Sequence, residues 1–266
     1  MTGMTGVTPS ATLALTVVGC SGSYPGPDSP ASSYLLEADD ADGRTWRILL
    51  DLGNGALGAL HRYADPLQID GIFLSHLHAD HCLDMTSYYV LRKYHPSGQQ
   101  PRILVWGPPD TDRRLAHAYD LPHSPGMREE FEFKQHRHGE PVTFGPFVVT
   151  PFEVDHPVPA YALRIEVGAV VIAYSGDTGP TPALIEAARG ADLFLSEASF
   201  RECDVNPPSL HLTGKEAAEA AVEAEVKRLV LTHVPPWHNA NEILAEAVGV
   251  YPGPLELAEA GAVYRL

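Results

Sequence analysis

The sequence predicts a single α/β domain built of packed layers. Short apolar, β-branched runs alternate with helical stretches and turn signals from one end of the chain to the other. No internal repeat and no linker divides the 266 residues, and 44% of them are hydrophobic, which is enough for a substantial core. We therefore expect one domain over residues 1–266.

The expected elements follow in chain order. The predicted strands are Ala11–Val18, Ser33–Ala38, Trp46–Leu50, Gly71–Ser75, Arg102–Trp106, Phe147–Phe152, Ala160–Val167, Val170–Tyr174, Asp192–Ser196 and Leu229–Thr232. The predicted helices are Ala56–Tyr63, Cys82–Tyr94, Pro182–Ala188, Gly214–Val226 and Asn241–Ala247. Thr213 is a good N-cap for the fourth helix.

Two stretches lie outside this pattern. Residues 1–10 are polar and carry no Lys or Arg, so we expect a flexible tail, and Leu13–Val18 lacks the basic flank of a signal peptide. Residues 107–140 are rich in Pro, His and charge and are expected to form an insertion or lid. No apolar run reaches the ~18 residues of a membrane span, and the expected location is the cytoplasm.

Charge and cysteine content narrow the possible partners. The net charge is −16 with His neutral, and no basic run is present, so a large nucleic acid is an unfavourable partner. A small anion drawn in by a bound metal is not excluded. Three cysteines in a chain of this length do not form a disulfide framework.

The strongest chemical signal is a cluster of metal-ligand residues after an apolar strand. The segment Ser75-His76-Leu77-His78-Ala79-Asp80-His81 follows the run Gly71–Leu74. His-x-His at the end of a strand directs two imidazoles to the same side of the chain, and Asp80 and His81 follow in the turn. Imidazole and carboxylate are preferred zinc ligands, so this loop predicts a metal site.

Three later residues complete the set. His156, Asp177 and His233 each stand where an apolar strand ends, the position at which open sheets place their ligands. Taken singly, each residue is better explained as a hydrogen-bonded turn residue. Together with the first motif they favour a shared metal centre.

The order His-x-His-x-Asp-His, His, Gly-Asp-Thr and Thr-His resembles the metallo-β-lactamase superfamily, in particular its ribonuclease Z-like branch. The segments Gly190–Phe200 and His211–Ala218 are similar to further motifs of that branch. Gly19–Ser23, Pro27–Ser32, His78–Asp84 and Thr232–Trp237 resemble an actinobacterial group of cyclic-nucleotide phosphodiesterases.

This resemblance implies a four-layer αβ/βα sandwich, in which two mixed β-sheets lie face to face with helices outside. It implies that His76, His78 and His156 hold one metal ion, that Asp80, His81 and His233 hold a second, and that Asp177 bridges them. A homodimer is implied by the resemblance as well.

Such a centre suits phosphodiester cleavage. Two ions ~3.5–4 Å apart can share a water and lower its pKa toward ~7, which supplies a metal-bound hydroxide at neutral pH. Asp80 is in a position to orient that water or to take its proton. Zinc is the expected ion, although a His/Asp site also accepts Mn, Fe or Co. The expected reaction is hydrolysis of 3′,5′-cAMP to 5′-AMP.

The leaving alkoxide needs a proton, and His211 is the candidate donor, with Glu197 orienting its ring. The simpler interpretation of His211 is a residue at the start of the following helix. Asp51 and Thr178 are expected to support the metal ligands without binding the ions, although a turn Asp that stabilises its own backbone remains an alternative for Asp51.

The loop Ser21–Ser33 offers hydroxyls that could reach a phosphate or ribose, with Ser21, Ser23 and Ser33 as candidates. An ordinary tight connection is an equal alternative for this loop.

Three other functions stay open. A ribonuclease Z-like nuclease that trims RNA 3′ ends shares every metal motif, but the interval from His156 to Asp177 is too short for the tRNA-clasping arm of that branch. Lactone and thioester hydrolases share the first motif and do not explain the Glu197–His211 pair. A metal-binding protein without catalysis is the third alternative.

Overall fold

The computed structural model describes residues 13–266; the expected tail at 1–10 lies outside the described residues. The first sheet has the strand order β14-β1-β2-β3-β4-β5-β6. Its strands are β1 (Leu13–Gly19), β2 (Ser33–Asp39), β3 (Thr45–Leu50), β4 (Gly71–Phe73), β5 (Ile103–Gly107), β6 (Phe131–Gln135) and β14 (Val263–Arg265). The sheet is mixed, since β14 to β3 pair antiparallel and β3 to β6 pair parallel.

The second sheet has the order β13-β12-β11-β10-β9-β8-β7 and is mixed in the same way. Its strands are β7 (Val142–Phe144), β8 (Phe147–Glu153), β9 (Tyr161–Val167), β10 (Val170–Tyr174), β11 (Leu193–Glu197), β12 (Leu229–Thr232) and β13 (Leu255–Leu257). The two sheets together confirm the predicted pair of mixed sheets.

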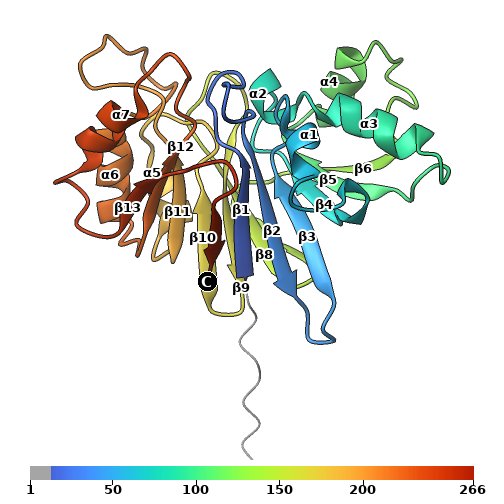
Figure 1. The fold of residues 1–266 in the computed structure, drawn as a ribbon, viewed down its shortest axis with the longest axis horizontal. Coiled ribbons are helices and arrows are strands. Elements are labelled where there is room, and N and C mark those ends of the chain that lie inside the picture. The colour runs from blue at the N-terminus through green and yellow to red at the C-terminus, as the bar shows by residue number, and fades with distance from the viewer. Residues whose placement is uncertain (1–12) are drawn as a thin grey trace, which may run out of the picture.

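Helices cover the outer face of each sheet (Figure 1). The first sheet is flanked by α1 (Ala56–Leu60), α2 (Ala79–Cys82), α3 (Met85–Tyr94) and α4 (Thr111–Ala118), together with the 3-10 turn η1 (Pro66–Gln68). The second sheet is flanked by α5 (Pro182–Ala188), α6 (Gly214–Glu223) and α7 (Ala240–Ala247). The four-layer α/β sandwich expected from the sequence is therefore present.

Three apolar layers hold the sandwich together. The middle layer joins the facing sides of the two sheets, with Leu15 and Phe73 from the first sheet and Leu163 and Leu195 from the second all fully buried. The outer layers join the first sheet to α1–α4 and the second sheet to α5–α7. Burial of apolar surface, at roughly 25 cal/mol per Å², is the main force that fixes this stacking.

The segment 107–140 differs from the expected irregular insertion. It forms α4 and β6, and β6 extends the first sheet by pairing parallel with β5. Phe131 is fully buried on this strand, so the alternation of Phe131 and Phe133 places β6 on the core. The charged neighbours Glu132 and Lys134 occupy the other positions of the strand.

The predicted helix Cys82–Tyr94 is broken in two. Asp84 stands between α2 and α3, and its carboxylate accepts a 2.9 Å hydrogen bond from the backbone N–H of Leu57 near the start of α1. The backbone N–H of Asp84 donates to the carbonyl of Leu52. This anchoring aligns α2, which carries two of the predicted metal ligands, with the loop that follows β3. Among residues 13–266, every helix is too short or too polar to cross a bilayer.

Candidate metal centre

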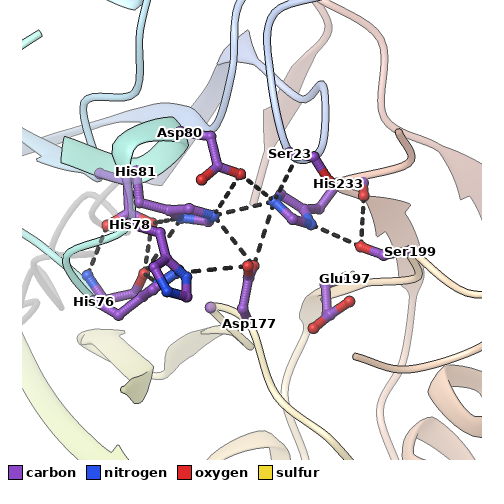
Figure 2. A network of polar contacts seen from close by, with 12 residues as sticks. Ser23, His76, His78, Asp80, His81, Asp177, Glu197, Ser199 and His233 are labelled. Carbon is purple, nitrogen blue, oxygen red and sulfur yellow. Dashed lines mark hydrogen bonds and ion pairs between the residues drawn. The ribbon is translucent and has the colours of Figure 1, made fainter. Parts of the chain in front are cut away.

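The predicted metal ligands meet at one edge of the sandwich. His76 and His78 lie between β4 and α2, and Asp80 and His81 lie on α2. The second sheet supplies the rest, with His156 after β8, Asp177 after β10 and His233 after β12. Figure 2 shows the side chains of the first and second sheets converging on Asp177.

Two ligand sets form within this group. One consists of His76, His78, His156 and Asp177, and the other of Asp80, His81, Asp177 and His233, with the ligand atoms of each set within 4.8 Å of one another. Asp177 belongs to both sets, as a bridging carboxylate would. These are the same two sets that the sequence resemblance implies.

The spacing of the nitrogen atoms fits a bound cation. Nε2 of His81 lies 3.1 Å from Nε2 of His233 and 3.2 Å from Oδ1 of Asp177. In the first set, Nδ1 of His78 lies 3.1 Å from Nε2 of His76 and 3.2 Å from Nε2 of His156. Oδ1 of Asp177 is buried without a hydrogen-bond partner. A carboxylate and several imidazole nitrogens at such spacing are the donor set that a divalent metal prefers.

The outer nitrogens of the ligands fix which nitrogen faces the centre. Nδ1 of His81 donates to Asp51 at 2.7 Å. Nδ1 of His156 lies 2.9 Å from the carbonyl oxygen of Leu210, which can only accept, so this nitrogen carries the proton. The rings of His81 and His156 are therefore turned so that Nε2 points into the centre, as ligand histidines with hydrogen-bonded outer nitrogens do, whereas His78 faces the centre with Nδ1.

His233 is oriented by a residue that the sequence analysis missed. The hydroxyl of Ser199 donates to the backbone carbonyl of His233 at 2.8 Å, and it lies 2.8 Å from Nδ1 of the same ring (Figure 2). Because the Ser199 hydroxyl already donates its proton to that carbonyl, its oxygen accepts a hydrogen bond from Nδ1 of His233. Ser199 lies two residues after Glu197 in the segment Gly190–Phe200. This position is the signal in the sequence that could have identified it.

Asp51 supports both ligand sets. It is fully buried, and its carboxylate accepts hydrogen bonds from the N–H of Ser75 at 2.6 Å, the hydroxyl of Ser75 at 2.7 Å, the hydroxyl of Tyr174 at 2.7 Å and Nδ1 of His81. The Ser75 hydroxyl in turn lies 3.1 Å from Nδ1 of His76. One carboxylate thus orients His81 directly and His76 through Ser75. The contribution of Tyr174 was not predicted.

Burial keeps the imidazoles of the first set neutral. It lowers the pKa of His76, His78 and His156, because a charged ring is poorly solvated there. Burial acts in the opposite direction on Asp177, but the neighbouring His233 and His81 outweigh it and hold the pKa of Asp177 well below its ordinary value. Neutral imidazole and ionised carboxylate are the forms that bind metal.

His211 and Glu197 stand beside the centre. Nδ1 of His211 lies 2.9 Å and 3.1 Å from the two carboxylate oxygens of Glu197, and 3.9 Å from Oδ2 of Asp177. Although burial lowers the pKa of His211, the Glu197 and Asp177 carboxylates raise it to about 9. The ring is therefore protonated at neutral pH, with Nε2 left free of Glu197.

Glu197 has no free ligand atom. It is fully buried, and besides His211 it accepts hydrogen bonds from the N–H of Thr178 at 2.7 Å and the N–H of Leu212 at 3.4 Å. Glu197, His211 and His233 also lie within metal-ligand distance of one another. Both carboxylate oxygens of Glu197 are, however, already engaged in hydrogen bonds with protein groups. Thr178 contacts Glu197 through its backbone, next to Asp177.

The three predicted substrate-binding serines lie in different places. Ser33 is fully buried and donates to the carbonyl of Asp51 at 2.9 Å. Ser21 is buried and donates to the carbonyl of Tyr24 at 2.8 Å. Both hydroxyls are thus engaged within the protein. Ser23 is exposed, and its backbone N–H, 3.5 Å from Nε2 of His233, faces the centre (Figure 2).

A sandwich of two mixed sheets with His/Asp sets at one edge defines a metallo-hydrolase. The family model described as beta-lactamase superfamily domain matches residues 46–234, so the chain belongs to that family. The match spans the strands and loops that carry every candidate ligand from His76 to His233.

Several proteins are similar to this chain over nearly its whole length. An uncharacterised protein of Mycobacterium leprae is 45% identical over 259 residues, which cover 96% of this chain and 89% of the relative. A ribonuclease Z of Myxococcus xanthus is 28% identical over 308 residues, covering 96% and 98%. The crystal structure of the metallo-beta-lactamase fold protein YhfI from Bacillus subtilis superposes with a TM-score of 0.84 at 26% identity, covering 96% and 100%.

Proposed function

We propose that the protein is a two-metal phosphodiesterase that hydrolyses cyclic nucleotides, with 3′,5′-cAMP converted to 5′-AMP as the principal reaction. The single observation that carries this proposal is the Glu197–His211 pair beside Asp177. Hydrolysis of a phosphodiester expels an alkoxide, which needs a proton donor at the edge of the metal centre. His211, held at one nitrogen and free at the other, occupies that place.

The metal ligands would hold two divalent ions, with zinc proposed for both because the donor set consists of imidazole and carboxylate only. Bound there, the ions would supply Lewis-acid stabilisation of charge on the phosphoryl oxygens and an acidified water. Asp80 lies at the rim of the second set, 8% exposed, with Oδ2 bonded to His233 at 3.0 Å. Its other oxygen would orient a nucleophile or accept its proton.

The chain's own residues define how protons would move. Glu197 accepts a hydrogen bond from Nδ1 of His211 and thereby fixes the ring. Nε2 of His211 would donate its proton to the O3′ leaving group as the phosphorus–oxygen bond breaks. The Glu197 carboxylate would stabilise the protonated ring before transfer, as the orienting acid of a catalytic triad does.

Surface charge supports a small substrate rather than a long one. The net charge of −16 opposes approach of a polyanion, and that repulsion grows with the number of phosphates. The interval from His156 to Asp177 holds only β9, β10 and their turns, which leaves no room for a tRNA-clasping arm. A cyclic mononucleotide carries one negative charge, which the ions would neutralise.

The likeness to ribonuclease Z makes RNA 3′-end processing the second candidate. Both functions need the same centre and the same proton donor, so substrate size is the discriminating variable. The same metal-loaded preparation is offered a precursor tRNA with a 3′ trailer and, separately, 3′,5′-cAMP. The length of the RNA product reports on RNA processing, and chromatography of the nucleotides reports on hydrolysis of cAMP.

The test begins with protein stripped by a chelator and reloaded with Zn²⁺ or Mn²⁺. It is incubated with 3′,5′-cAMP beside the Asp80→Ala variant and beside Asp42→Ala, an exposed acid remote from the centre. Metal-dependent formation of 5′-AMP by wild type and by Asp42→Ala, absent from Asp80→Ala, supports the proposal.

Other outcomes redirect or overturn it. Cleavage of an aryl phosphodiester without turnover of cAMP would keep the chemistry and reject the substrate. Inactivity toward both from a metal-loaded sample would reject phosphodiester hydrolysis, and lactones and thioesters would be the next substrates to test.

A further inference from the structure

Two aromatic side chains form an exposed pair. Tyr24 and Trp237 have ring centroids 5.4 Å apart with planes tilted by 35°. Tyr24 is 42% exposed and Trp237 is 59% exposed, so each ring packs on the other and remains about half open to solvent. Isolated exposed apolar residues need no explanation, but two rings in contact and left open to water form a surface suited to a further ring.

The pair stands on the two loops that lead away from the metal centre. The N–H of Gly22 donates to the carbonyl of Val234 at 3.1 Å, and the next N–H, that of Ser23, faces Nε2 of His233 (Figure 2). Tyr24 follows Ser23 directly in the chain. The loop that carries Tyr24 and the loop that carries Trp237 are therefore joined side by side at a metal ligand.

The contact between these loops depends on a glycine. A Cβ atom at Gly22 would lie 2.1 Å from the carbonyl oxygen of His233, so only glycine allows this approach. A few residues further on, Gly26 lies against Pro236, where a Cβ would meet Cγ of that ring at 3.2 Å. The two loops are thus in contact at both points, through the backbone at Gly22 and through the ring of Pro236 at Gly26, and Tyr24 lies between these glycines in sequence.

Both loops are conformationally restricted. Ser23 and His233 adopt left-handed φ angles of 63° and 59°, which non-glycine residues hold only where their surroundings enforce it. The Ser21 hydroxyl fixes the carbonyl of Tyr24, and Pro235 and Pro236 precede Trp237. The aromatic pair is thus held in place before a ligand arrives, and preorganisation reduces the entropy lost on binding.

We propose that Tyr24 and Trp237 form a stacking subsite for the nucleobase of the substrate whose phosphate occupies the metal centre. The inference rests on the proposed phosphodiesterase function and adds the part of the ligand that the metal ligands do not touch. Stacking uses the face of a base and not its hydrogen-bonding edge, so it accepts any base. The subsite therefore predicts that adenine and guanine nucleotides bind with similar affinity.

The test compares two ligands that differ only in the base. Calorimetric titration of zinc-loaded protein with 5′-AMP and with ribose 5-phosphate separates the contribution of the ring from that of the phosphate and sugar. Trp237→Ala should weaken binding of 5′-AMP by about 5- to 100-fold and leave ribose 5-phosphate unchanged, since base–aromatic stacking is worth that much per base. Trp237→Phe should recover most of the loss.

Two further variants sharpen the comparison. Tyr24→Ala should weaken 5′-AMP in the same selective way. Tyr94→Ala removes another exposed aromatic ring, 66% exposed at the end of α3, and should change neither affinity. Thermal unfolding of each variant shows whether it is folded.

Equal binding of 5′-AMP by wild type and Trp237→Ala, or equal weakening of both ligands, would overturn the subsite. The outcome is independent of catalysis. If Trp237→Ala selectively lost binding of 5′-AMP but the wild-type protein did not hydrolyse cAMP, the subsite would be retained and the proposed function rejected. Turnover of cAMP with an unchanged KM in Trp237→Ala would retain the proposed function and reject the subsite.

Discussion

Asp51 accepts a 2.7 Å hydrogen bond from Nδ1 of His81 while both residues are fully buried. The Asp51→Asn variant keeps the shape of the side chain and tolerates the left-handed φ of 58° at this position. It replaces a carboxylate oxygen, which accepts hydrogen bonds, with an amide nitrogen, which donates them. We expect metal affinity to fall about 10- to 100-fold, the usual effect of losing a partner that orients a ligand. Metal content after dialysis against a graded chelator measures this.

Tyr174→Phe is the matched comparison for Asp51→Asn. It removes one of the donors to Asp51 and leaves the His81 contact intact. We expect it to lower the free energy of unfolding by about 1 kcal/mol and to leave metal affinity near that of wild type. An Asp51→Asn protein that retained wild-type metal affinity would contradict the role given to this carboxylate.

His211→Ala should slow cAMP hydrolysis by ~10²-fold or more while metal content stays unchanged, because the ring supplies a proton and no ligand. Elemental analysis and initial rates on one preparation are the measurements. Glu197→Gln should also reduce the rate, since an amide cannot stabilise the protonated ring. Full activity in His211→Ala would remove the proton-donor assignment.

The burial of His136 predicts a pH dependence of stability that is separate from the titration of the candidate metal ligands. It is 2% exposed, and burial lowers its pKa to about 4, so the folded state holds it neutral. The unfolded chain binds a proton below pH ~6.5, so the free energy of unfolding falls as the pH drops from 6.5 toward 4. Between pH 7.5 and 5 this one group should cost about 2 kcal/mol. His136→Gln should lose that part of the pH dependence, measured by urea unfolding at both pH values.

An exposed histidine provides the control. His117 is exposed on α4, and His117→Gln should leave the difference in stability between the two pH values as in wild type. If His136→Gln and His117→Gln behaved alike, the buried ring would not be responsible.

Gly22→Ala should displace His233, because the added Cβ would lie 2.1 Å from its carbonyl oxygen. Reduced metal content and a loss of cAMP turnover are expected, together with a lower melting temperature. Gly58→Ala adds the same methyl group on the exposed side of α1, where nothing lies within 4 Å, and should raise the free energy of unfolding by about 0.4–1 kcal/mol. Equal effects of the two substitutions would exclude the proposed contact.

The sequence predicted the elements that carry strong local patterns. The long apolar strands and the ligand loop after β4 are readable because hydrophobic period and residue chemistry coincide there. Strands β13 and β14 have three residues each; β13 pairs with β12 across the intervening helix α7, and β14 pairs with β1 at the other end of the described chain. No local signal marks such strands, because the pairing that stabilises them is tertiary.

The same distinction holds in the site. The ligands were predictable as a set, because several imidazoles and carboxylates at successive strand ends have few other uses together. Ser199 and Tyr174 were missed because a serine and a tyrosine are common anywhere, and their roles depend on which buried atom they meet. Ser23 was named for its hydroxyl, whereas the structure turns its backbone N–H toward His233. Backbone direction follows from a left-handed turn that composition does not reveal.

Each ligand set draws on both halves of the chain. His76, His78, Asp80 and His81 belong to the half that is synthesised first, and His156, Asp177 and His233 to the half that follows. Neither half carries a full set, so hydrolytic power can arise only after β12 has docked and brought His233 into place. A nascent or truncated chain therefore lacks a complete ligand set, and an ion that binds the complete sets stabilises the packing of the two sheets against each other.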